Sequence, residues 1–191
     1  MKIIKLANAL KDMERVELAK AIREGKILIY PTDTLYGIGC NAEKTKSVER
    51  IVKAKGRGSG KPLSVISPSK EWVAENTKIT SDKIRFIDRL FPGPYTVVLK
   101  ARIKIPFVVS KEEKIGIRIP RNEFCDFIRS QGFPFVTTSV NLSEKNPVYS
   151  IGSIPEKIKQ IADYAVDAGE IHGHASRVFD ISGKTLEILR W

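Results

Sequence analysis

The sequence has 191 residues, of which 42% are hydrophobic, and it carries a formal net charge of +11 at pH 7. This length suits one well-cored domain spanning residues 1–191, and the charge favours anionic partners such as nucleotides or RNA. No stretch has the roughly 20 apolar residues of a membrane span, the start lacks a secretory signal, and Cys40 and Cys125 lie in unrelated contexts, so we expect a soluble cytoplasmic protein without a disulfide framework.

Apolar spacing in the first third of the chain predicts strands that alternate with helices. A first strand includes Ile3 to Leu6, and a helix follows in which Val16, Ala19 and Ile22 recur at helical spacing until Gly25 ends it. Residues 26–30 read as a buried strand that runs into Pro31. A further helix with Val48 and Ile51 on one face ends at a basic, glycine-rich loop, and a strand over 63–66 comes next.

The rest of the chain predicts a similar mixture. Residues 81–90 should be a helix with Ile84 and Ile87 inward, and Ser153 with Glu156 resembles a capping box that opens a helix to Ala162. A helix is also expected over 123–130, with strands over 96–99, 115–119, 135–138, 165–167, 178–181 and 187–189. The predicted fold is therefore α/β (α+β), with a twisted, open mixed sheet flanked by helices.

The loop from Lys55 to Leu63 contains Lys55, Arg57 and Lys61 separated by glycines. Glycine lets backbone N–H groups approach a phosphate and the cations neutralise it, so we expect an anion site here rather than a solvated charge run. It is not a Walker loop, because the glycine spacing differs and Pro62 follows the lysine. The glycines at 37 and 39 also fit a dinucleotide fingerprint poorly, since they follow a polar turn.

Polar residues follow two of the predicted strands. Thr32, Asp33 and Thr34 come directly after residues 26–30, where they are either turn residues or donors to a small polar substrate, and Ser139 and Asn141 follow 135–138. In the 115–119 strand, Arg118 sits between isoleucines and therefore requires a carboxylate or phosphate partner. His172 and His174 are interpreted as ordinary loop residues rather than metal ligands.

Taken in order, several motifs resemble the YrdC-like family of threonylcarbamoyl-AMP synthases. They are the P-T-[DE]-T-x-Y-G segment at 31–37, K-x-R at 55–57 with Lys-Pro-Leu at 61–63, P-G-P-x-T at 92–96, Ile-Arg-Ile-Pro at 117–120, S-x-N-x-S at 139–143 and S-x-V-x-D at 176–180 leading to Arg190. The resemblance runs from about residue 10 to the end. Glu144 and Arg177 depart from the usual pattern, and we expect the short form of the family, without an additional C-terminal domain.

The resemblance implies an open sheet with a positively charged concave face, and an enzyme that converts L-threonine, bicarbonate and ATP with Mg²⁺ into threonylcarbamoyl-AMP and pyrophosphate. The product serves N6-threonylcarbamoyl modification of the adenosine beside the anticodon of tRNAs, through a downstream transfer machinery. The implied residues are Lys55 and Arg57 for catalytic electrostatics; Thr34, Arg118 and Ser176 for threonine; and Arg57, Lys61, Ser139, Asn141 and Arg190 for ATP. No protein side chain is expected to ligate a metal.

Two other functions stay open at this point. A non-catalytic module that binds double-stranded RNA or tRNA would also suit the +11 charge, although it leaves the threonines after the 26–30 strand unexplained. A relative that uses carbamoyl phosphate is the second alternative, but such domains belong to longer chains with zinc-finger-like cysteines. The synthase is therefore the preferred hypothesis.

Overall fold

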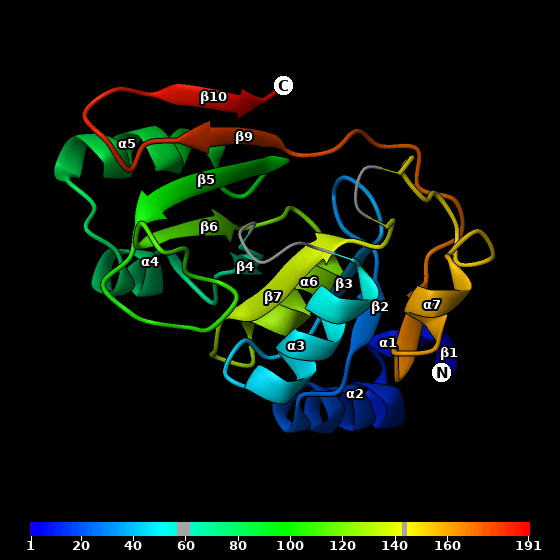
Figure 1. Cartoon of the computed structure of the whole chain (residues 1–191). Helices are drawn as coiled ribbons and strands as arrows, with labels where there is room; N and C mark the ends of the chain where they lie inside the picture. The colour runs from blue at the N-terminus through cyan, green and yellow to red at the C-terminus, as the bar shows by residue number, and fades with distance from the viewer. Residues whose placement is uncertain (57–61, 143–144) are drawn as a thin grey trace.

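The computed structural model describes residues 1–56, 62–142 and 145–191 (Figure 1). Within these ranges, ten strands form one open, mixed sheet in the order β1-β8-β2-β3-β7-β4-β6-β5-β9-β10. The strands are β1 (Lys2–Lys5), β2 (Leu28–Tyr30), β3 (Gly37–Gly39), β4 (Ser64–Ile66), β5 (Tyr95–Lys100), β6 (Lys114–Arg118), β7 (Phe135–Ser139), β8 (Tyr164–Asp167), β9 (Arg177–Asp180) and β10 (Glu187–Arg190). The helices are α1 (Leu6–Ala9), α2 (Asp12–Glu24), α3 (Thr45–Ala54), α4 (Lys70–Asn76), α5 (Ser81–Leu90), α6 (Glu123–Arg129) and α7 (Glu156–Lys159). The predicted fold class is confirmed.

Some local predictions are wrong, each for a physical reason. The capping box does not form: Pro155 precedes α7 without a side-chain cap, and the Ser153 hydroxyl instead bonds that of Ser150. Ile84 is exposed while Ile87 is buried, and Val16 is 70% exposed because α2 turns a different face inward, the one with Leu18 and Ile22. Sequence spacing therefore located these helices better than it located their buried faces.

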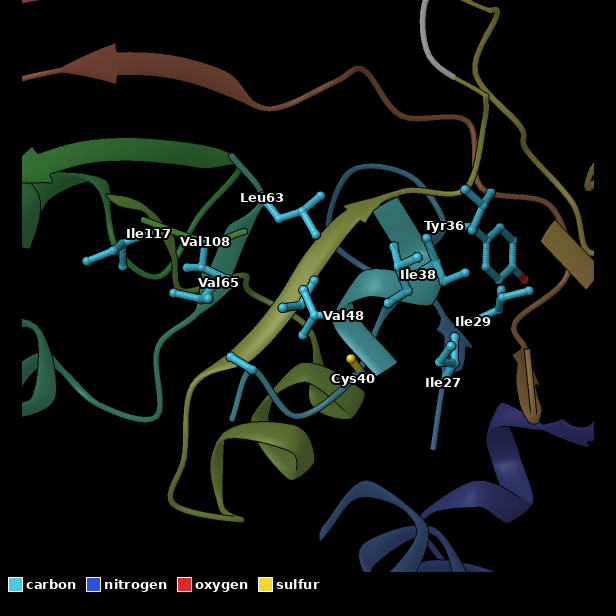
Figure 2. Packing of buried hydrophobic residues seen from close by; sticks show 14 of the residues in the cluster. Ile27, Ile29, Tyr36, Ile38, Cys40, Val48, Leu63, Val65, Val108 and Ile117 are labelled. Carbon is cyan, nitrogen blue, oxygen red and sulfur yellow. The ribbon is translucent and has the colours of Figure 1, made fainter. Parts of the chain in front are cut away.

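Strand β2 separates two hydrophobic clusters because successive side chains of a strand point to opposite faces of the sheet. Ile27 and Ile29 belong to the larger cluster, where Figure 2 shows them near Val48 of α3. This cluster also includes buried residues of α4, α5 and α7. Leu28 and Tyr30 belong to the smaller cluster, which includes residues of α1, α2 and α6. Helices therefore cover both faces of the sheet at β2, which accounts for its uninterrupted apolar sequence.

The same alternation leaves part of one face uncovered. In β6, Ile115 and Ile117 point into the larger cluster, whereas Lys114, Gly116 and Arg118 line a cavity on the other face. In the neighbouring strand β4, Ser64 lines that cavity while Ile66 joins the smaller cluster. The cavity therefore continues the face that α2 and α6 cover at β2, and the candidate site lies on this uncovered part.

Strand β3 contains two glycines and was absent from the predicted elements. Its tight packing against β7 explains the need for them: a Cβ at Gly39 would lie 1.8 Å from the carbonyl oxygen of Val136. Gly37 pairs with Ser139 in the register of the two strands. A close backbone approach thus sets the position of the polar residues that follow β7.

We predict that Gly39→Ala lowers the free energy of unfolding by at least about 3 kcal/mol, because the added methyl group can be accommodated only by separating β3 from β7. Chemical denaturation of the full chain measures this change. The matched control is Gly183→Ala, where a Cβ meets no atom within 4 Å and the expected change is below about 0.5 kcal/mol. Equal stabilities for the two variants would contradict the backbone contact.

Candidate active site

The largest part of the site is a cavity of about 260 Å³ on the uncovered face of the sheet, which we call the main cavity. Strands from both halves of the sheet contribute to its lining: Ser64, Thr96, Val98, Lys114, Gly116, Arg118, Thr137, Thr138, Ser139, Ser176, Val178 and Arg190, with Pro62 and Leu63 at one side. Three of these side chains are cationic and none is acidic. The main cavity is therefore suited to an anionic ligand.

A smaller recess of about 50 Å³ shares a wall with the main cavity. Thr32, Thr34 and Tyr36 line it from the segment after β2, and residues common to both hollows include Arg118, Ser139, Ser176 and Arg190. Thus all three predicted threonine ligands, Thr34, Arg118 and Ser176, border the recess together with two predicted ATP ligands. The recess size suits a small polar molecule that contacts a larger one in the main cavity.

Arg118 is held by the segment that follows β2, although 84 residues separate it from Thr34. Its Nη2 atom donates to Asp33 Oδ1 at 2.9 Å and to Thr34 Oγ1 at 3.1 Å. Thr34 is itself fixed, since its hydroxyl lies 2.9 Å from that of Thr32, which also bonds backbone groups of the same turn. The carboxylate partner that the sequence required for Arg118 is thus Asp33, which was first read as a turn residue or substrate donor.

Arg190 approaches the same hollow from β10. Its Nε donates to the carbonyl oxygen of Ser176 at 2.8 Å and its Nη2 to the Ser176 hydroxyl at 2.9 Å, and that hydroxyl also lies 2.8 Å from Thr96 Oγ1. Desolvation, and then the positive charge of Arg118, lowers the pKa of the Arg190 guanidinium. Two guanidinium groups that repel each other across one hollow are stabilised by an anion between them.

Lys114 is a lining residue that the sequence did not single out. Its ammonium donates to Asp180 Oδ2 at 2.7 Å, and this bond raises the pKa of the lysine. Burial alone would raise the pKa of Asp180, but hydrogen bonds from Lys114 and Ser182 bring it below its ordinary value. The alternation of β6 could have indicated Lys114, because it shares the strand face of Arg118 two pleats away.

The segment after β8 packs against the turn whose residues Thr34 and Tyr36 line the recess. The Tyr36 hydroxyl donates to the carbonyl oxygen of Gly169 and accepts from the N–H of Ala168, both at 2.8 Å. Further along, Gly173 lies so close to Thr34 that a Cβ there would be 1.8 Å from the Thr34 carbonyl oxygen. Main-chain contact therefore fixes this segment against the turn, and Ser176, three residues after Gly173, lines the recess.

Lys55 lies outside both linings, although it adjoins them. It is 3% exposed, and its ammonium donates to the carbonyl oxygens of Ser139 at 2.5 Å and of Asn141 at 2.8 Å. The Ser139 hydroxyl in turn donates to the Asn141 side-chain oxygen. The structure thus shows that Lys55 anchors the segment at the end of β7 by hydrogen bonds to its backbone. The role of Lys55 in catalytic electrostatics stays a prediction.

The other residues predicted from the sequence lie away from the two hollows or outside the described residues. Arg57 and Lys61 fall outside the described residues, as do the end of the S-x-N-x-S run and Glu144. His172 pairs with Glu170 at 3.0 Å on the surface. In the described part of the chain, no group of three His, Cys, Asp or Glu residues is arranged to hold a metal ion. No helix of those residues is long and apolar enough to cross a bilayer.

The class that the structure defines is a mixed α/β protein in which cations and hydroxyls converge on an uncovered face of the sheet. Comparison with known proteins gives the family: the Sua5/YciO/YrdC model, described as telomere recombination, matches residues 20–191. The chain belongs to this family.

Three relatives illustrate the similarity. A provisionally named threonylcarbamoyl-AMP synthase of Methanocaldococcus jannaschii is 37% identical over 88% of this chain and 82% of its own length. The threonylcarbamoyl-AMP synthase of Pyrococcus abyssi is 30% identical over 94% of this chain, which spans only 54% of that protein. The crystal structure of Pyrococcus abyssi Sua5 complexed with L-threonine matches with a TM-score of 0.89 at 28% identity, over the whole of this chain and 57% of that one.

The hydrogen bonds from Lys55 to the backbone of Ser139 and Asn141 should stabilise the fold. Lys55→Met should lower the free energy of unfolding by about 2 kcal/mol or more, because two buried carbonyl oxygens lose charge-assisted hydrogen bonds. Denaturation of the matched control Lys53→Met, whose side chain is 74% exposed in a surface pair with Glu49, should differ from the native chain by less than about 0.5 kcal/mol. Native-like stability of Lys55→Met would rule out the structural role.

Proposed function

We propose that this protein is an L-threonylcarbamoyladenylate synthase, which makes threonylcarbamoyl-AMP and pyrophosphate from L-threonine, bicarbonate and ATP. The observation that carries the proposal is the junction of two hollows: a recess bordered by Thr34 and Arg118 shares a wall with a larger, cation-lined cavity. Relatives named threonylcarbamoyl-AMP synthase, and a similar structure complexed with L-threonine, support it.

Threonine would occupy the recess. Arg118 would pair with its carboxylate, and the hydroxyls of Thr34 and Ser176 would bond its polar groups. The amine adds to CO₂ derived from bicarbonate, which forms a C–N bond and releases a proton to give the carbamate. A carbamate oxygen then attacks the α-phosphorus of ATP, and the bond to pyrophosphate breaks. This displacement depends on positioning and charge neutralisation and requires no protein nucleophile.

ATP would lie in the main cavity, whose lining contains Ser139 and Arg190. Asn141, Arg57 and Lys61 are assigned to ATP by resemblance, and Lys55 and Arg57 would supply electrostatic stabilisation. Mg²⁺ would enter bound to the phosphates of ATP, since a lining of cations and hydroxyls suits phosphate oxygens better than a divalent cation. The recess is small and lies between residues of several strands, which would limit the access of water to the unstable carbamate.

We further propose that the product serves tRNA threonylcarbamoylation through a downstream transferase, and that the basic protein contacts tRNA directly. The net charge of +11 supports an interaction with phosphate backbones. A module that only binds RNA would have no need for a buried arginine beside Asp33 and two threonines. The carbamoyl-phosphate-using relative differs in its substrate, which a direct assay distinguishes.

The test incubates the purified protein with ATP, Mg²⁺, bicarbonate and L-threonine and measures pyrophosphate and the adenylate. Product should require both threonine and bicarbonate. Tight tRNA binding with no ATP affinity would favour the RNA module, and product from carbamoyl phosphate without threonine would favour the other relative. In either case the synthase proposal fails.

Arg118→Met should lower kcat/KM for threonine by about 100-fold or more, because the carboxylate of the amino acid loses its charge-assisted partner. Arg121→Met is the matched control: this arginine lies nearby, but its side chain is exposed and contacts the Pro92 carbonyl oxygen, so activity should stay within about twofold. Similar losses in both variants would remove the assignment of Arg118 to threonine.

A further inference from the structure

Asp33 joins two separate parts of the site through its two carboxylate oxygens. Oδ1 accepts from Arg118 Nη2 at 2.9 Å, and Oδ2 accepts from the backbone N–H of Arg121 at 2.9 Å. The side chain of Asp33 is 9% exposed and that of Arg118 is 11% exposed, so the ion pair is largely removed from water. The bond to Arg121 fixes the Asp33 carboxylate relative to the segment that follows β6. Arg118 is the last residue of β6.

This arrangement determines which N–H groups of Arg118 are available to a ligand. Asp33 and Thr34 both take their hydrogen bonds from Nη2. Nε is buried and has no hydrogen-bond acceptor in the part of the chain that the structure describes. An unpaired N–H of a buried guanidinium is costly, and it suggests that an acceptor from outside the protein completes the site.

The charges around Arg118 make a fixed carboxylate necessary. Arg190 approaches the same hollow and carries the same charge, which lowers its pKa, so each guanidinium repels the other when no anion is present. Without Asp33, Arg118 would lose its only described ion pair and would gain by turning toward solvent. Asp33 holds Nη2 of Arg118 from the segment after β2, whereas Arg190 is hydrogen-bonded to Ser176.

We propose that Asp33 is a positioning residue: it orients Arg118 so that the remaining N–H groups face the recess and select an amino acid with a free carboxylate. This inference rests on the proposed function, since it deepens the role of the threonine recess. Asp33 touches no reacting atom. Asp33 holds the Arg118 guanidinium in its binding orientation before the ligand arrives. Less conformational freedom is therefore lost when the carboxylate of the amino acid binds.

The experiment compares Asp33→Asn with Asp88→Asn, an exposed surface aspartate that pairs with Lys70. The asparagine oxygen can accept from Arg118 or from Arg121 but its amide cannot serve both, so the orientation is lost with little change in volume. Titration calorimetry measures the affinities of L-threonine, of L-threoninol, which lacks the carboxylate, and of ATP. Asp33→Glu, which keeps the charge, is the conservative variant.

The native protein and Asp88→Asn should prefer threonine over threoninol. Asp33→Asn should weaken threonine binding by about 10- to 100-fold while threoninol and ATP change by less than about threefold, and Asp33→Glu should recover part of the preference. An unchanged preference in Asp33→Asn overturns the inference. Equal weakening of all three ligands, together with a lower melting temperature, also overturns it, because that result indicates a purely structural role.

Two further results concern threonine binding by the native protein and the folding of Asp33→Asn. If the native protein binds ATP but not threonine, the proposed function fails rather than the role of Asp33 alone. If Asp33→Asn does not fold, Asp33→Ser replaces it, since its hydroxyl is too short to bridge Arg118 and Arg121. The same change in the ratio of threonine to threoninol affinity is then expected of Asp33→Ser, and an unchanged ratio overturns the inference.

Discussion

The site depends on one buried cation. Arg118 is 9% exposed at the end of β6, and removing a guanidinium from water costs several kcal/mol unless its charge and N–H groups are satisfied. Asp33 and Thr34 supply part of that compensation from the segment after β2, and three strands lie between β2 and β6 in the sheet. The ion pair therefore joins two parts of the sheet at the point where a ligand would complete the remaining hydrogen bonds.

The sheet makes room for this cation by leaving one part of a face uncovered. Where helices cover both faces, as at β2, every residue of the strand is apolar. Where one face is uncovered, as at β6, isoleucines alternate with Lys114, Gly116 and Arg118. Gly116 lies between the two cations, and a Cβ there would come within 2.6 Å of the Ser64 hydroxyl oxygen. Because successive side chains of β6 point to opposite faces of the sheet, its five residues contribute both to the hydrophobic core and to the polar cavity.

Much of this could be predicted from sequence, but not the long-range contacts. The bounds of α5 match the expected 81–90, and Gly25 ends α2 in a left-handed conformation, because local spacing and a cap determine both. Strand β3 was missed because its two glycines are unfavourable in a strand and are required only by contact with β7. The motifs identified Thr34, Arg118, Ser139, Ser176 and Arg190, which border the recess. The link from Lys55 to Ser139 and Asn141 and the pairing of Asp33 with Arg118 have no local signal in the sequence.

The position of Ser176 and Arg190 late in the chain has a consequence for biosynthesis. The glycine-rich loop, the turn with Thr34 and the strand with Arg118 are all translated before the segment that packs Gly173 against Thr34. A nascent chain that has exposed only its first 160 or so residues outside the ribosome therefore lacks one wall of the recess and the second guanidinium. The complete lining of the recess therefore forms only after Ser176 is in place and β10 has joined the sheet with Arg190.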